Sequence, residues 1–215
     1  MPLARGRFIT LEGGEGAGKS TQTRRLQERL QSAGHEVVVT REPGGSEGAE
    51  EVRNLLVSGS VDRWDAVSEA MLHFVARRDH LLRLIEPALA KGIWVISDRF
   101  TDSTIAYQGY GQGGDLTVLD AVRRIAIGDF DPDMTLLLDL APEDGLARAA
   151  SRDNEASRYD RMGLAMHERL RAGFLALAAA QPERIAVVDA SSAEDDVADR
   201  IWALVRKRYG LSGST

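Results

Sequence analysis

Short apolar, β-branched runs alternate with longer amphipathic segments along this chain. The apolar runs predict strands at about 7–12, 35–40, 93–98, 134–140 and 185–190. The amphipathic segments predict helices at about 18–33, 46–58, 65–91, 114–127, 142–152, 160–180 and 194–209. Because strands and helices alternate, we expect a three-layer α/β/α fold in which helices flank a five-stranded parallel sheet. The run Leu136-Leu137-Leu138 agrees with this, since strands covered on both faces are apolar on both.

Composition narrows the class of protein. The 215 residues carry a formal charge of −6 and no cysteine. The negative charge argues against a general binder of nucleic-acid polymers or membrane surfaces. The lack of cysteine excludes disulfides, zinc–thiolate sites and thiol catalysis. No linker divides the chain, so we expect one domain over 1–215. The N-terminus is polar and the chain has no long apolar run, which predicts a soluble cytoplasmic protein.

A phosphate-binding motif follows the first predicted strand. Residues Gly13 to Ser20 match G-x-x-x-x-G-K-[ST], in which glycines let the backbone amides turn inward around an anion. Lys19 would reach the β and γ phosphates of ATP, and the Ser20 hydroxyl would ligate Mg²⁺. The sequence therefore predicts an ATP-binding loop that comprises Gly13, Gly14, Glu15, Gly16, Ala17, Gly18, Lys19, Ser20 and Thr21.

Further chemical groups follow the second and third predicted strands, where open parallel sheets bind ligands. After the second strand, Arg41 and Pro43 are candidates for substrate binding. After the third, Asp98 would share the Mg²⁺ with Ser20, and Arg99 would clamp a phosphoryl group. Neutral donors and acceptors for a base or sugar come next, at Ser103, Thr104, Tyr107 and Gln108. The alternative for this region is a surface salt bridge with helix-capping hydroxyls.

The long predicted helix at 65–91 carries a second candidate group. His73 and Arg77 are four residues apart and so share one helix face, where a ring and a guanidinium could stack on and hydrogen-bond to a base. Phe74 points about 100° away and is read either as a core residue or as the aromatic partner of the base. His80 is expected to be a solvated helix residue.

Arginines recur in a polar segment at about 148–160. Arg148, Arg152 and Arg158 could form a flap over the phosphates, which would supply positive charge to the transition state and exclude water. We therefore take these three, with Lys19 and Arg99, as candidate catalytic residues. The alternative is a solvated helix hairpin.

Several of these strings together resemble the bacterial thymidylate kinase family. The resemblance spans about 7–205, and it is carried by 8–21, by Thr40-Arg41-Glu42-Pro43-Gly44-Gly45, and by Asp98-Arg99-Phe100 followed by Ala106-Tyr107-Gln108-Gly109. It implies a P-loop kinase with a small lid segment at about 148–160. It also implies transfer of the ATP γ-phosphoryl group to dTMP, giving dTDP and ADP for dTTP biosynthesis, with Mg²⁺, in a homodimer. The dimer contact would involve the third helix and the segment around 114–127.

The resemblance also implies roles for single residues. Glu15 would approach the 3′-hydroxyl of the deoxyribose, and Arg99 would hold the dTMP phosphate. The pair His73 and Arg77 would meet the base, although pairing Phe74 with Arg78 would keep the aromatic residue that is common in the family. The loop has Ala17 and no arginine, so the lid would supply the catalytic arginine.

The phosphate-binding motif by itself is compatible with other functions. Another nucleotide kinase acting on a different base is the nearest alternative. A GTP-dependent switch protein is disfavoured, because the asparagines Asn54 and Asn154 do not form an Asn-Lys-x-Asp element. A dinucleotide-binding oxidoreductase is disfavoured because no G-x-G-x-x-G window occurs.

Overall fold

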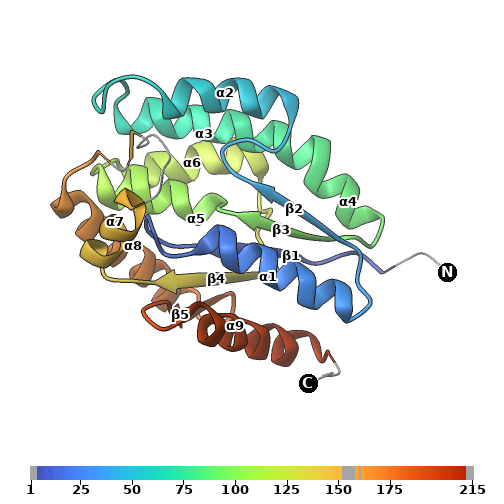
Figure 1. Ribbon diagram of the computed structural model, residues 1–215. Helices are drawn as coiled ribbons and strands as arrows, with labels where there is room; N and C mark the ends of the chain where they lie inside the picture. The colour runs from blue at the N-terminus through green and yellow to red at the C-terminus, as the bar shows by residue number, and fades with distance from the viewer. Residues whose placement is uncertain (1–3, 152–157, 160, 212–215) are drawn as a thin grey trace.

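Five parallel strands form one sheet at the centre of the computed structural model, which describes residues 4–151, 158–159 and 161–211. The strand order is β2-β3-β1-β4-β5. The strands are β1 (Phe8–Glu12), β2 (Val37–Arg41), β3 (Trp94–Asp98), β4 (Met134–Asp139) and β5 (Ile185–Asp189). Each neighbouring pair is parallel, which confirms the predicted five-stranded sheet (Figure 1).

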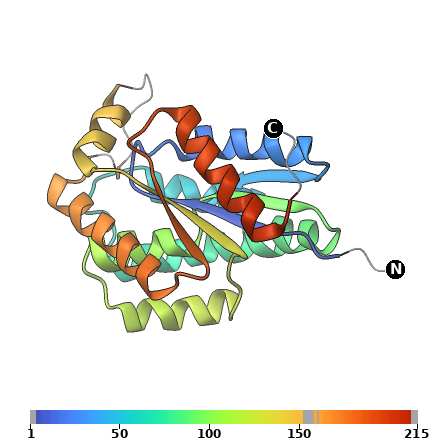
Figure 2. The ribbon, with the colours of Figure 1, turned by 90° about the horizontal axis from the view of Figure 1, so that it is seen from below.

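Helices cover both faces of this sheet, as Figures 1 and 2 show. On one face, α1 (Lys19–Ser32) and α9 (Glu194–Tyr209) pack against a core that includes Leu136 and Leu138. On the other face lie α3 (Ala66–His80), α6 (Leu116–Ile127) and α8 (Leu164–Ala180), and Leu137 points toward α8. The alternation of three consecutive leucines between two cores is what a strand covered on both sides requires.

Two helices pack on other helices. Helix α2 (Glu47–Val57) packs on α3, and α7 (Pro142–Ala150) contacts α8. Among the residues that the structure describes, no helix is both long and apolar enough to cross a membrane.

The predicted helix at 65–91 is continuous but not uniform. It consists of α3, a π-helical turn η1 (Leu81–Ile85) and α4 (Glu86–Ala90). Asp65 caps its start by accepting hydrogen bonds from the backbone amides of Val67 and Ser68, both at 3.0 Å. The wide turn precedes Pro87, which has no N–H to donate to the preceding turn, so the local hydrogen-bond register changes there.

One helical stretch was not predicted. Residues 101–111 form α5 (Thr101–Thr104) and the π-helical η2 (Ile105–Gly111), where the sequence suggested only a ligand-binding segment after a strand. Its β-branched residues and glycines have low helix propensity. Packing against α8 outweighs that preference, because η2 and α8 share extensive contacts and Ala106 and Tyr107 belong to a buried cluster with α8.

Candidate active site

The phosphate-binding loop connects β1 to α1 at the carboxyl edge of the sheet. Gly13, Gly16 and Gly18 have positive φ angles of 139°, 67° and 88°. A side chain at Gly16 would also clash, since a Cβ there would lie 2.0 Å from the carbonyl oxygen of Gly145 on α7. The glycines therefore provide both the turn and the close approach of α7, and the amides at the start of α1 point toward an anion site.

Lys19 is buried within this loop with 7% of its surface exposed. Its Nζ donates to the carbonyl oxygens of Gly13 at 3.1 Å and Gly14 at 2.7 Å. Burial, together with the positive charge of Arg99, lowers the pKa of Lys19 to about 8. Among the described residues no carboxylate lies within ion-pair distance of Lys19, so the phosphates of a nucleotide would supply the missing counter-charge.

Ser20 and Asp98, the two residues predicted to share a metal ion, are in direct contact. The Ser20 hydroxyl donates to Asp98 Oδ2 at 2.8 Å. Hydroxyl and carboxylate oxygens are ligands that Mg²⁺ prefers, and a P-loop site leaves the other positions to phosphates and water. Within the described ranges no group of three or more histidine, cysteine or acidic side chains could hold a metal ion. The donor set therefore fits a metal that arrives with a nucleotide.

Glu15 and Arg99 form an ion pair beside the loop. Arg99 Nη2 lies 3.0 Å from Glu15 Oε1, and the Tyr107 hydroxyl donates to the same oxygen at 2.6 Å. Burial alone would raise the pKa of Glu15, but Arg99, Lys19 and Tyr107 outweigh it and lower the pKa to about 2. Glu15 is therefore ionised near neutral pH, and both of its oxygens can accept hydrogen bonds.

Arg99 has an unusual backbone conformation, with a φ of 74°. Such a conformation is costly for a residue with a side chain and persists only where neighbours enforce it. The Arg99 amide donates to Leu11 O at 2.9 Å, and its carbonyl accepts from the Ser97 hydroxyl at 2.7 Å. Its Nη1 donates to Gly13 O at 2.9 Å and to Ser103 Oγ at 3.1 Å. The guanidinium is thus aimed at the loop.

Glu12 organises the turn that follows Arg99, a role that was not predicted. Its carboxylate accepts from the Phe100 amide at 2.7 Å and from the Ser103 hydroxyl at 2.5 Å. Burial and the nearby Asp102 raise the pKa of Glu12 to about 7. The only signal in the sequence was an acid at the end of an apolar strand, directly before Gly13.

A group of arginines lies near Asp98. Arg41 is half-exposed and pairs with Glu50 at 3.1 Å. Arg53, on α2, donates to the Pro43 carbonyl oxygen at 2.6 Å. Burial, with Arg41 and Arg99 nearby, lowers the pKa of Arg53. Sequence reasoning missed Arg53, because one arginine on an amphipathic helix gives no signal, but its charge lies close to those of Arg41 and Arg99.

Arg77 is almost fully buried in an ion pair. Its Nε donates to Glu42 Oε2 at 2.7 Å, and its Nη2 donates to the Phe100 carbonyl oxygen and to Thr104 Oγ1, both at 3.0 Å. Its Nη1 is buried without a hydrogen-bond partner among the described residues. One nitrogen of the guanidinium, with its two N–H groups, therefore has no partner there, while Nε and Nη2 hold the neighbouring elements together.

His80, on the same helix as Arg77, also contacts Glu42. The prediction that His80 is solvated was wrong. None of its surface is exposed. Its Nδ1 lies 3.0 Å from Glu42 Oε1, and its Nε2 lies 2.7 Å from Thr40 Oγ1. The physical reason is that Glu42, at the end of β2, is itself buried and draws both basic side chains of α3 inward.

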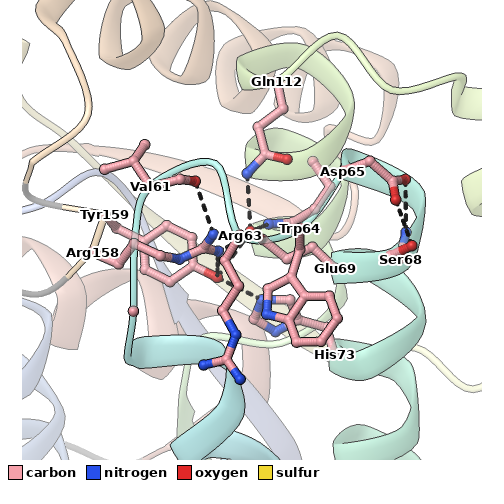
Figure 3. A network of polar contacts seen from close by, with 12 residues as sticks. Val61, Arg63, Trp64, Asp65, Ser68, Glu69, His73, Gln112, Arg158 and Tyr159 are labelled. Atoms are coloured by element: carbon pink, nitrogen blue, oxygen red, sulfur yellow. Dashed lines mark hydrogen bonds and ion pairs between the residues drawn. The ribbon is translucent and has the colours of Figure 1, made fainter.

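His73 and Phe74 lie in different environments, which decides between the two registers considered from the sequence. Phe74 is 1% exposed and packs in the core with Phe100 and Ile85, so the structure places it away from a ligand site. His73 is half-buried, and its Nε2 lies 3.1 Å from the Tyr159 hydroxyl (Figure 3). Of the two residues, His73 is the one available to a base.

Gln108 is the last of the neutral candidates and is fully buried. Its Nε2 donates to Glu69 Oε1 at 2.7 Å, whereas its Oε1 has no partner within the described part of the chain. Thr104 is engaged by Arg77, and Ser103 is engaged by Arg99 and Glu12. Ser103 and Tyr107 thus lie on the loop side, whereas Thr104 contacts Arg77 and Gln108 contacts Glu69.

The three predicted lid arginines do not form one group. Arg148 donates to the carbonyl oxygen of Ala190 at 3.2 Å. Arg152 lies outside the described residues. Arg158 has no exposed surface and is paired with Glu69, so the structure contradicts its predicted freedom to meet a phosphate (Figure 3). The reason is an acid on α3 that attracts the guanidinium into the interior, which local sequence could not reveal.

A buried lysine in a glycine loop, a hydroxyl–carboxylate pair beside it and a nearby group of arginines, all at one edge of a parallel α/β sheet, are typical of a P-loop kinase. The family model described as Thymidylate kinase matches residues 11–201. The chain therefore belongs to the thymidylate kinase family.

Similar proteins agree over nearly the full length. The chain is 52% identical over 209 residues to the thymidylate kinase of Caulobacter vibrioides, covering 97% of this chain and 100% of that protein. It is 50% identical over 206 residues to the thymidylate kinase of Afipia carboxidovorans, covering 95% of this chain and 90% of that protein. A crystal structure of thymidylate kinase from Ehrlichia chaffeensis superposes with a TM-score of 0.75 at 35% identity, covering 94% of this chain and 99% of that one.

Proposed function

We propose that this enzyme transfers the γ-phosphoryl group of ATP to the 5′-phosphate of dTMP and releases dTDP and ADP, as a step in dTTP biosynthesis. The observation that carries the proposal is the presence of two anion sites at one edge of the sheet. One is the P-loop with Lys19, and the other is formed by Arg41, Arg53 and Arg99. A kinase whose acceptor is itself a phosphate needs both, because the two anions repel each other.

On the donor side, the P-loop amides and Lys19 hold the β and γ phosphates. They neutralise the charge that develops on the transferred group, so catalysis rests on positioning and electrostatics. Ser20 and Asp98 would hold Mg²⁺ with the nucleotide, and the ion would supply Lewis-acid stabilisation of negative charge there. No covalent intermediate with a side chain is needed.

On the acceptor side, Arg99 binds the dTMP phosphate and Glu15 accepts a hydrogen bond from the sugar. The already ionised acceptor phosphate needs no strong general base. At the base, Arg77 Nη1 and Gln108 Oε1 are a buried donor and a buried acceptor without partners among the described residues. A base that brings a carbonyl oxygen and an N–H, as thymine does, would satisfy both.

The catalytic arginine of the lid remains a prediction. Arg148 stays a candidate because it is exposed at the end of α7, and Arg152 stays one on the grounds of the sequence alone. Replacement of the true catalytic arginine by alanine should lower kcat while the affinity for dTMP changes little.

A homodimer is part of the proposal. Apolar side chains on α3 and η1 recur at helical spacing and are exposed, namely Met71, Val75 and Leu82, and Ile125 on the adjacent α6 is 83% exposed. Such a stripe is typical of an association surface. Val75→Asp should convert a dimer to a monomer in analytical ultracentrifugation, and a parent that sediments as a monomer would contradict the proposal. We place the reaction in the cytoplasm, where both nucleotides are available.

The acceptor is tested by supplying ATP, Mg²⁺ and one monophosphate at a time from dTMP, dUMP, UMP, CMP and AMP. We expect the highest kcat/KM for dTMP. A higher value for any of the others would assign the chain to a different nucleotide kinase, which is the alternative that the P-loop alone leaves open.

A further inference from the structure

Glu69 is the centre of a buried polar network that joins α3, η2 and the segment at 158–159 (Figure 3). Its Oε1 accepts hydrogen bonds from Gln108 Nε2 at 2.7 Å, Gln112 Nε2 at 2.9 Å and the Tyr159 hydroxyl at 3.0 Å. Its Oε2 is paired with the guanidinium of Arg158. The two glutamine amides and the guanidinium can only donate at these contacts, so the Glu69 oxygens act as acceptors throughout the network.

This arrangement fixes the direction of the hydrogen bond between Tyr159 and His73. A tyrosine hydroxyl has one proton to donate and two lone pairs that accept. Tyr159 donates its proton to Glu69, and its oxygen lies 3.4 Å from Arg158 Nη2 and 3.1 Å from His73 Nε2. Since no second proton is available on the hydroxyl, His73 Nε2 must be the donor.

We propose that Tyr159 is a positioning residue that ties His73 to the Glu69 carboxylate and holds the imidazole in one orientation, as the Nε2–H tautomer with an unprotonated Nδ1. This inference rests on the proposed function, in which His73 meets the base of dTMP. We call the hydrogen-bond chain Glu69–Tyr159–His73 the relay. An imidazole ring that is fixed before the substrate arrives loses less freedom on binding, so the relay should contribute to the affinity for dTMP.

Charge and packing around the relay agree with this role. Burial, with Arg77 and Arg158 nearby, lowers the pKa of His73 to about 3, so the ring is neutral and carries a single proton at pH 7. The Tyr159 ring also packs edge-on against Tyr107 at 5.4 Å, and the Tyr107 hydroxyl binds Glu15 at 2.6 Å. The relay is therefore continuous with the sugar side of the proposed acceptor site.

The tautomer can be read directly in the unmodified protein. We would record long-range ¹H–¹⁵N NMR spectra of the histidine side chains and assign His73 by comparison with His73→Phe. We expect the Nε2 resonance of a protonated nitrogen and the Nδ1 resonance of an unprotonated one at pH 7. The opposite tautomer, or a doubly protonated ring, would overturn the proposal whether or not the enzyme phosphorylates dTMP.

A double-mutant cycle tests whether Tyr159 acts through His73. Loss of one hydrogen bond in Tyr159→Phe should raise the KM for dTMP about two- to tenfold while kcat stays within about twofold. In a His73→Phe background, which has no nitrogen to position, the same change should have no further effect on KM. An equal effect of Tyr159→Phe in both backgrounds would mean that Tyr159 acts on the ligand or the fold directly, and would reject the relay.

A matched control comes from Tyr209, whose hydroxyl is buried without a partner among the described residues and which packs against Trp94 in the other core. Tyr209→Phe should leave the KM for dTMP and the spectrum of His73 unchanged. Lack of dTMP phosphorylation by the parent would reject the proposed function, and the NMR result would still decide the tautomer.

Discussion

Two charged clusters in this molecule differ in how their charges are matched. In the phosphate cluster, which we define as Lys19, Ser20 and Asp98, the ammonium meets only carbonyl oxygens and the carboxylate meets a hydroxyl. In the buried frame, defined as the pairs Arg77–Glu42 and Arg158–Glu69, each guanidinium meets a carboxylate, and all four side chains are at most 3% exposed.

This difference distinguishes the residues that take part in the reaction from the residues that maintain the structure. A buried charge without a counter-ion is unfavourable, so the phosphate cluster gains most when a nucleotide and its metal supply the missing charges. Within the described residues, the charges of the buried frame are already matched, and only Arg77 Nη1 and Arg158 Nε are buried without a hydrogen-bond partner. Unmatched buried charge therefore marks the reacting centre, whereas matched buried charge marks the residues that hold it in shape.

The largest effect should follow removal of the unmatched lysine. Lys19→Ala should lower kcat by about 10³-fold or more, because the transferred phosphoryl group loses its fixed cation. Steady-state kinetics with dTMP and ATP measure this. Lys91→Ala, at an exposed position on the end of α4, serves as the control and should behave like the parent. A kcat of Lys19→Ala within tenfold of the parent value would contradict the distinction between the two clusters.

Breaking the buried frame should instead affect stability. Glu42→Gln leaves the charge of Arg77 buried without a counter-ion, and it should lower the free energy of unfolding by about 3 kcal/mol. Urea denaturation measures this. The exposed pair Arg24–Glu28, also at 2.7 Å, provides the matched control, since Glu28→Gln should cost at most about 0.5 kcal/mol. Equal losses in the two variants would contradict the structural role of the frame.

Asp98 tests the metal side of the phosphate cluster. Asp98→Asn keeps an acceptor for the Ser20 hydroxyl but removes a charge, so kcat should fall about 10- to 100-fold at a fixed magnesium concentration. Raising the magnesium concentration should restore part of the loss. Asp131→Asn, at an exposed position, should show neither the loss nor the recovery. A loss that does not respond to magnesium would argue that Asp98 only holds the loop.

The smallest effect concerns pH and His73, which contacts Tyr159 next to the Arg158–Glu69 pair of the buried frame. The pKa of His73 is lowered to about 3 in the folded protein from an ordinary value of 6.5. Between these values the unfolded chain binds a proton that the folded chain excludes, so stability falls as the pH drops below 6.5. His73→Phe should remove about 1–2 kcal/mol of this loss between pH 7 and pH 5. Urea titrations at pH 7 and pH 5 measure the free energy of unfolding of both proteins. The same difference between parent and variant at the two pH values would contradict this prediction.

The phosphate cluster could be predicted from the sequence, and the buried frame could not. Each strand was predicted to within two residues, and the pairing of Ser20 with Asp98 followed from the rule that parallel strands present ligands at their carboxyl edge. In the frame, Glu42 and Arg77 are 35 residues apart, and Glu69 and Arg158 are 89 apart. No local pattern distinguishes a charge that will be buried at that distance from a solvated one, which is why Arg158 and His80 were misjudged.

The central claim is that the unmatched charges of the P-loop serve phosphoryl transfer to dTMP. The most direct test is ³¹P NMR of the purified protein with ATP, Mg²⁺ and dTMP. We expect dTDP and ADP to form in equal amounts, at a rate that depends on dTMP and is abolished in Lys19→Ala. Release of inorganic phosphate without dTDP, or formation of ADP at a rate independent of dTMP, would contradict the account.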